Sequence, residues 1–75
     1  MIIEIEQELL VGDKVRIKGL SIYKHNFIEE IGVIKRIIKD YYIYTHTTII
    51  TIPTVYYVAL RKHRSYYIDD NIELI

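Results

Sequence analysis

The sequence lacks cysteine and tryptophan and has one proline and three glycines among its 75 residues. Without cysteine the chain forms neither disulfides nor thiolate metal sites, so its core alone must stabilise the fold, and a reducing compartment is predicted. No apolar run approaches the roughly 18 residues of a membrane span, and glutamates stand near the N-terminus where a signal peptide needs lysines. These absences predict a soluble, cytoplasmic protein.

The length predicts a single domain over residues 1–75, because a chain of this size buries only about 60 per cent of its unfolded surface and has no room for a second core. The formal net charge is zero, but it is unevenly distributed. Residues 14–64 carry all ten basic residues against three acidic ones, whereas the segments before and after them are acidic. A basic middle between acidic ends favours oriented association with a charged partner.

The clearest strand signal is an alternation of charged and branched apolar residues near the beginning of the chain. Val15 and Ile17 are expected to point into a core, whereas Lys14, Arg16 and Lys18 are expected to form a cationic ladder on the outer face. This segment is the best marker of the fold.

The other segments also favour strands over helices, because isoleucine, tyrosine, valine and threonine dominate them. Pro53 should end a strand or lie at a sheet edge, since proline donates no backbone hydrogen bond. The expected elements are strands over 2–6, 14–18, 31–38 (bent or bulged), 41–52, 54–60, 65–68 and 72–74, turns at 12–13, 39–40 and 69–71, a long loop over 19–30, and a charged hairpin tip over 61–64. The prediction is an all-β fold with five to seven short strands.

The order of four segments resembles the small SH3-like barrels, including KOW-type modules and the photosystem I reaction-centre subunit with this fold. They are Gly12–Ile17, Gly32–Ile34, Tyr56–Val58 and Tyr66–Leu74, with the long loop after the first. The resemblance covers residues 11–75 and implies a partly open SH3-like barrel. It says little about function, because such barrels bind proteins, nucleic acids and small ligands alike.

One departure from signalling SH3 domains argues against binding of proline-rich peptides, and one narrower resemblance implies an enzyme. The acidic loop residues and the tryptophan with which signalling SH3 domains bind proline-rich peptides are missing here. The segment from Gly12 to Arg16 and the tail from Ser65 to Ile75 are similar to plasmid-type dihydrofolate reductase, which implies a small oligomeric enzyme as a minor alternative. The Val-Gln-Ile-Tyr run of that enzyme's active site is replaced here by residues 66–69.

Tyrosine and basic residues supply the candidate binding groups. Neighbouring tyrosines in a strand face opposite sides, so about half of them should be exposed, where tyrosine is well suited to protein contacts. The alternative is that they only stabilise the sheet as cross-strand pairs. The predicted partner-binding residues are Lys14, Arg16, Lys18, Tyr42, Tyr44, Tyr57, Arg61, Lys62, Arg64 and Tyr67.

The same basic and aromatic groups, together with Lys35 and Arg36, also suit RNA or DNA, because lysine and arginine bind phosphates and tyrosine stacks on bases. The zero net charge argues against this alternative, since a dedicated nucleic-acid binder of this size usually has a basic excess.

Neither metal nor catalytic chemistry is predicted. His25, His46 and His63 lie about twenty residues apart and lack local ligand spacing. The pairs Glu29–Glu30 and Asp69–Asp70 fit turns or solvated positions more simply than general acid and base roles. We therefore expect a non-enzymatic protein without cofactors.

The sequence as a whole predicts a protein-interaction module with an acidic protein partner. Its isoleucine, tyrosine and lysine bias fits a small viral or mobile-element protein that binds and inhibits a host factor. Homodimerisation through an exposed Tyr41–Ile52 strand is a further hypothesis.

Overall fold

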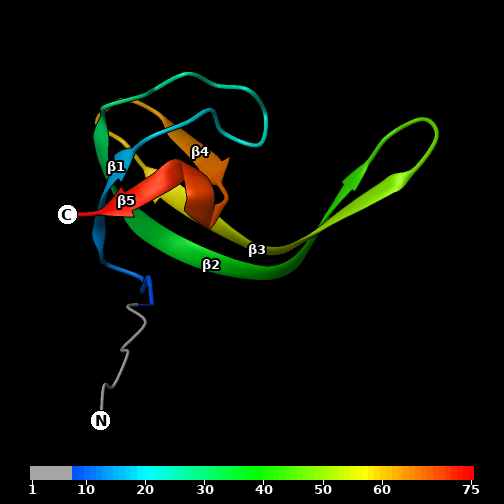
Figure 1. Ribbon diagram of the computed structural model, residues 1–75, viewed down its shortest axis with the longest axis horizontal. Helices are drawn as coiled ribbons and strands as arrows, with labels where there is room; N and C mark the ends of the chain where they lie inside the picture. The colour runs from blue at the N-terminus through cyan, green and yellow to red at the C-terminus, as the bar shows by residue number, and fades with distance from the viewer. Residues whose placement is uncertain (1–7) are drawn as a thin grey trace, which may run out of the picture.

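The computed structural model describes residues 8–75 and contains one antiparallel sheet of five strands (Figure 1). These are β1 (Lys14–Ile17), β2 (Ile31–Tyr44), β3 (Ile49–Ala59), β4 (Arg64–Tyr67) and β5 (Ile72–Leu74), and a 3-10 turn, η1 (Asp69–Asn71), precedes β5. The predicted all-β class is confirmed. Over residues 8–75 there is no helix with the length and apolar character that crossing a membrane requires.

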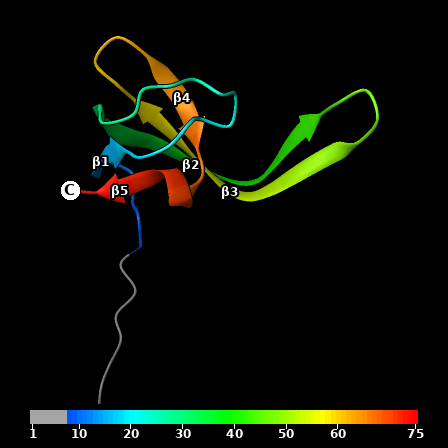
Figure 2. The same ribbon diagram turned by 45° about the horizontal axis from the view of Figure 1, so that its top comes forward.

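The strand order is β4-β3-β2-β1-β5, and neighbouring strands are antiparallel throughout. The sheet curves around a core but is not closed between β4 and β5 (Figure 2). This architecture matches a small, partly open barrel. β2 and β3 are far longer than the other strands, and their outer halves extend beyond the curved sheet.

The core lies on the concave face of the sheet. Val15, Ile17, Ile34, Val58 and Tyr67 are fully buried and pack in one cluster. The inward direction predicted for Val15 and Ile17 is therefore confirmed. Burying each such aliphatic side chain contributes about 1.5–3 kcal/mol.

The expected loop over residues 19–30 is also confirmed, and short-range hydrogen bonds hold it in place. The Ser21 hydroxyl accepts hydrogen bonds from the backbone N–H groups of Tyr23 and His25. Further along, the Phe27 ring stacks on His63, with ring centroids 4.6 Å apart. The loop therefore packs against the hairpin that joins β3 to β4.

The predicted turn at 39–40 and the predicted continuous strand over 41–52 are both wrong. β2 runs through residues 39–40 to Tyr44, and the chain reverses at residues 45–48 before β3 begins. The Thr45 hydroxyl accepts a hydrogen bond from the Thr48 N–H, and the Thr45 N–H donates to the Thr48 carbonyl. Threonine is typical of strands, so a turn closed by a threonine hydroxyl left no glycine or asparagine signal in the sequence.

Asp40 and Pro53 mark the point where the long hairpin leaves the rest of the sheet. Pairing is recorded on both sides, at Lys39 with Thr54 and at Tyr41 with Ile52. Asp40 has a positive φ of 54°, and Pro53 has no N–H to donate. We call residues 41–52 the arm and the other described residues the body. Pro53 was expected to end a strand or lie at a sheet edge; β3 continues through it, and it lies in the part of β3 that pairs with β2 alone.

Gly32 allows β2 and β3 to approach closely. A Cβ atom at this position would lie 2.6 Å from Leu60 Cδ2 and 2.7 Å from the Ala59 carbonyl oxygen. The expected bulge occurs slightly later, between Ile34 and Arg36, where the register with β3 shifts. The glycine thus serves close packing, and the bulge is separate from it.

The C-terminal half follows the sequence expectations closely. The charged tip connects β3 to β4, and the last strand has the predicted bounds of 72–74. The turn at 69–71 is η1. The predicted first strand over 2–6 lies outside the described residues.

Candidate binding surface

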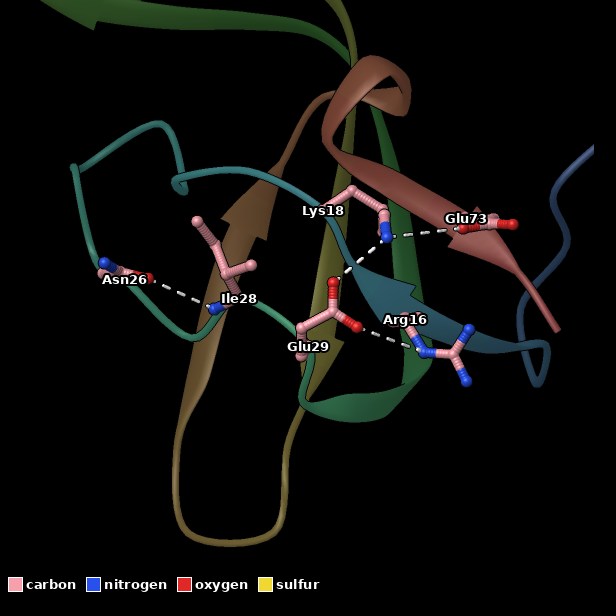
Figure 3. Close-up of polar contacts among 6 residues, drawn as sticks. All are labelled: Arg16, Lys18, Asn26, Ile28, Glu29 and Glu73. Atoms are coloured by element: carbon pink, nitrogen blue, oxygen red, sulfur yellow. Dashed lines mark hydrogen bonds and ion pairs between the residues drawn. The ribbon is translucent and has the colours of Figure 1, made fainter.

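The cationic ladder on β1 is largely neutralised by glutamates (Figure 3). Lys18 Nζ lies 3.0 Å from Glu29 Oε1 and 4.0 Å from Glu73 Oε2, and Arg16 Nε lies 3.8 Å from Glu29 Oε2. Lys14 is exposed and has no ion pair within residues 8–75. Two of the three ladder residues are therefore already paired with acids of the same chain.

The position of Glu29 results from the local backbone. The Ile28 N–H donates to Asn26 Oδ1, and the Glu29 N–H donates to the Ile17 carbonyl. Glu29 also has a positive φ of 75°. This conformation brings the Glu29 carboxylate beside β1, although the sequence had suggested only a solvated pair with Glu30.

A second basic group lies at the hairpin between β3 and β4, and there the cations are not paired. A depression of about 490 Å³ is lined by residues from β2, β3, β4 and the connecting tip. Among the described residues, no ion pair involves its lysines or arginines. We call the following set the basic depression: Lys35, Tyr57, Arg61, Lys62 and Arg64.

Lys35 joins this set because of the bulge in β2. Ile34 pairs with Val58 and Arg36 with Tyr57, so Lys35 is the extra residue between the two pairs. A bulge redirects a side chain relative to a regular strand. In the sequence Lys35 belongs to the basic set considered for nucleic acid but not to the predicted partner-binding residues, and only the paired doublets around it signalled the irregularity.

A hydrogen bond joins two residues that line the basic depression. Arg64 Nη1 donates to the Tyr57 hydroxyl at 3.3 Å, and this bond raises the pKa of Arg64 above its already high ordinary value. An arginine guanidinium is charged at physiological pH in any case, so this bond leaves the positive charge of the depression in place.

Four tyrosines form a cluster that the sequence analysis did not foresee. The Tyr66 ring contacts those of Tyr57, Tyr41 and Tyr23, with centroid distances of 4.9, 5.6 and 5.8 Å. Tyr23 belongs to the long loop and hydrogen-bonds to the Tyr41 hydroxyl. This bond, with a smaller effect of desolvation, raises the pKa of Tyr41 to about 12. The cluster links the arm, the loop and β4.

Tyr42 and Tyr44 lie in the arm, away from the basic residues. Their side chains are 54% and 75% exposed. In β2 they alternate with Tyr41 and Ile43, so they share the opposite face. Their predicted exposure is confirmed, but the structure does not bring them together with the basic depression.

Tyr67 was predicted as a surface contact, and the structure contradicts this. Its side chain is fully buried in the core, and burial raises its pKa. Its hydroxyl is the one buried side-chain polar atom of the described residues without a hydrogen-bond partner. β4 alternates, so Ser65 and Tyr67 face the core whereas Arg64 and Tyr66 face outwards.

The histidines lie in different surroundings. His25 Nδ1 is 2.9 Å from the Ser65 hydroxyl, His63 stacks on Phe27, and His46 lies in the turn of the arm. Within residues 8–75, no three His, Cys, Asp or Glu side chains gather as metal ligands would.

The predicted binding residues thus fall into separate groups. Tyr57, Arg61, Lys62 and Arg64 meet in the basic depression, the β1 ladder is mostly ion-paired, two tyrosines lie on the arm, and Tyr67 belongs to the core. Comparison with protein-family models, with curated proteins and with solved structures finds no match to this chain.

Proposed function

We propose that this protein is a non-catalytic interaction module whose basic depression binds an acidic segment of a partner protein. One observation carries the proposal. Four cationic side chains line one hollow, and none of them forms an ion pair with another described residue. Like charges brought together without compensation destabilise the free protein slightly, and an acidic ligand relieves that repulsion.

The contrast with the β1 ladder supports this location. Glu29 and Glu73 compensate Arg16 and Lys18, so an acidic partner would have to compete with carboxylates already in place. In the basic depression a partner carboxylate meets no such competitor within residues 8–75. Arginine also binds carboxylates with two parallel hydrogen bonds, which gives directional contacts.

The state of the aromatic residues favours protein over nucleic acid. The Tyr57 hydroxyl accepts from Arg64, and its ring packs on Tyr66. A ring already committed to an internal cluster is poorly available for base stacking. The basic surface is also compact, whereas binding along a phosphate backbone uses an extended basic groove.

The strand order supports the accompanying proposal of an SH3-like barrel. The central strands are consecutive, and β5 returns to pair with β1, which fits the segment order on which the resemblance rests.

Fluorescence anisotropy with a labelled Glu/Asp-rich peptide tests the function. We expect the double variant Arg61→Glu/Lys62→Glu to bind at least about tenfold more weakly than the wild type. Lys14→Glu/Lys18→Glu is the matched control, because it changes the net charge equally on the ladder, and it should retain most of the affinity.

Two results would contradict the proposal. Equal losses in both double variants would mean that only overall charge matters. Tighter binding of a single-stranded oligonucleotide, with an affinity that falls steeply with salt, would instead assign the site to nucleic acid.

A further inference from the structure

The outer face of the arm is an apolar surface on a hairpin that projects from the body. Cross-strand pairing joins Tyr42 to Thr51 and Tyr44 to Ile49, so these four side chains share one face. Tyr42, Tyr44 and Ile49 are 54%, 75% and 58% exposed. The arm projects away from the other strands in both views (Figures 1 and 2).

The inner face is covered to a greater extent. Tyr41 contacts Tyr23 and Tyr66 of the body, and Ile43 and Ile52 line a groove of about 390 Å³ together with Leu20 and Ile22 of the long loop. Thr51 of the outer face also lines this groove, whereas Tyr42, Tyr44 and Ile49 do not. A two-stranded hairpin is only marginally stable in water, so a face of this kind gains from being covered.

The chemistry of the arm indicates what covers it. The chain has no Asp, Glu, Lys or Arg from Tyr41 to Leu60. In a symmetric contact the same patch of both copies meets itself, so a face with charges of one sign would repel its copy. An uncharged face avoids this repulsion, and it offers nothing to a partner recognised by charge. These properties fit a second copy of the same chain.

The available area is also sufficient for a dimer of modest stability. Taking roughly 200 Å² for a fully accessible large side chain, Tyr42, Tyr44 and Ile49 together expose roughly 370 Å² per copy. Two copies therefore bury up to about 740 Å² from these residues, and the neighbouring threonines add to this area, which places the contact among weak, transient interfaces of less than about 1,200 Å². The area therefore corresponds to a reversible dimer.

We infer that two copies of this protein form a symmetric dimer in which the outer faces of their arms pack against each other. Stacking the ribbons gives two layers, each of two strands, with interdigitating tyrosine and isoleucine side chains. The connection between β3 and β4, whose residues 61–64 line the basic depression, lies away from the arm (Figure 2). Both copies can therefore keep it accessible, and the dimer does not depend on the proposed function.

Sedimentation velocity across low to high micromolar protein tests the inference. We expect wild-type protein to shift from 9.0 kDa towards twice that mass as its concentration rises. Tyr44→Glu/Ile49→Glu should remain monomeric throughout, because it places four like charges at the contact of the two copies. Circular dichroism checks that this variant keeps its β-sheet.

His46→Glu/Thr47→Glu is the matched control, since it adds the same charge in the turn of the arm, beyond the paired residues. It should weaken dimerisation less than the face variant does. A wild type that stays monomeric at all concentrations would overturn the inference. So would a dimer that survives Tyr44→Glu/Ile49→Glu, or assembly into species larger than a dimer. Arg61→Glu/Lys62→Glu, which tests the proposed function, should leave the dimer intact.

Discussion

The body and the arm are built from the same residue types, yet they place them in opposite surroundings. Ile17 and Ile34 of the body are fully buried, whereas Ile49 of the arm is more than half exposed. In the body the sheet curves, so one face is covered by its own strands and the long loop. The arm is a single ribbon with no second layer of its own. Residue type therefore predicts that a segment forms a strand. Whether its side chains are buried depends on whether a second layer of the protein covers that strand.

The largest difference in stability between the two regions is expected when an isoleucine in each is replaced by aspartate. Ile17→Asp is expected to lower the free energy of unfolding by more than about 4 kcal/mol and to unfold the domain, because a carboxylate would be buried without a partner. Ile49→Asp, at an exposed position, should cost less than about 1 kcal/mol. Urea denaturation at low protein concentration measures both, and similar losses would erase the distinction between body and arm.

A single methyl group should test how tightly the body is packed. Gly32→Ala is expected to destabilise the protein by about 1–3 kcal/mol, because its Cβ would overlap the Ala59 carbonyl and the Leu60 side chain. Gly12→Ala is the control, since nothing lies within 4 Å of that Cβ and only its positive φ is unfavourable. Gly12→Ala should lower the free energy of unfolding by about 1 kcal/mol. If Gly32→Ala is the milder of the two in thermal melts, the close approach of β2 and β3 is not rigid.

The smallest loss of stability is expected when the hydrogen bond between the arm and the long loop of the body is removed. Tyr23→Phe removes the hydrogen bond to Tyr41 and should cost about 1 kcal/mol. Amide hydrogen exchange should rise in the arm more than in β1 and β5. Tyr42→Phe on the outer face is the matched control, and equal exchange in both variants would argue against a role for this hydrogen bond.

The same contact predicts a pH dependence. The pKa of Tyr41 is raised from its ordinary 10.0 to about 12 in the folded protein. Its contribution to stability is therefore complete below about pH 10 and disappears as the pH rises through about 12. In an NMR titration of the tyrosine rings, Tyr23→Phe should lower the pKa of Tyr41 towards 10.0. An unchanged pKa would mean that burial rather than this hydrogen bond raises it.

Much of the fold could be predicted because strand signals are local. The alternation around Val15 placed β1 and its inward face, and the charged tip at residues 61–64 placed the β3–β4 hairpin. The arm was misread because its turn consists of residues that favour strands, and because Asp40 interrupts a strand without ending it. Such a turn depends on one threonine hydroxyl, which residue type alone does not reveal.

The candidate site was predicted only as an unsorted set of basic and tyrosine residues. Sequence spacing could not show that Glu29 lies beside Arg16 and Lys18, because Glu29 is eleven positions after Lys18, at the far end of the long loop. Nor could it show that the bulge directs Lys35 towards Arg61 and Arg64. Tyr67 was wrongly placed on the surface, since the alternation in β4 allowed either Tyr66 or Tyr67 to face inwards.

By itself, the sequence determined the all-β class, the approximate strands and the uncharged stretch from Tyr41 to Leu60, because these depend on residue type and on a period of two. The tertiary structure alone decided which cations are compensated, which tyrosines are buried and that half of the longest hairpin leaves the sheet. Those properties depend on distances between residues far apart in the chain. Charge pairing and burial are set by such distances, and no local pattern encodes them.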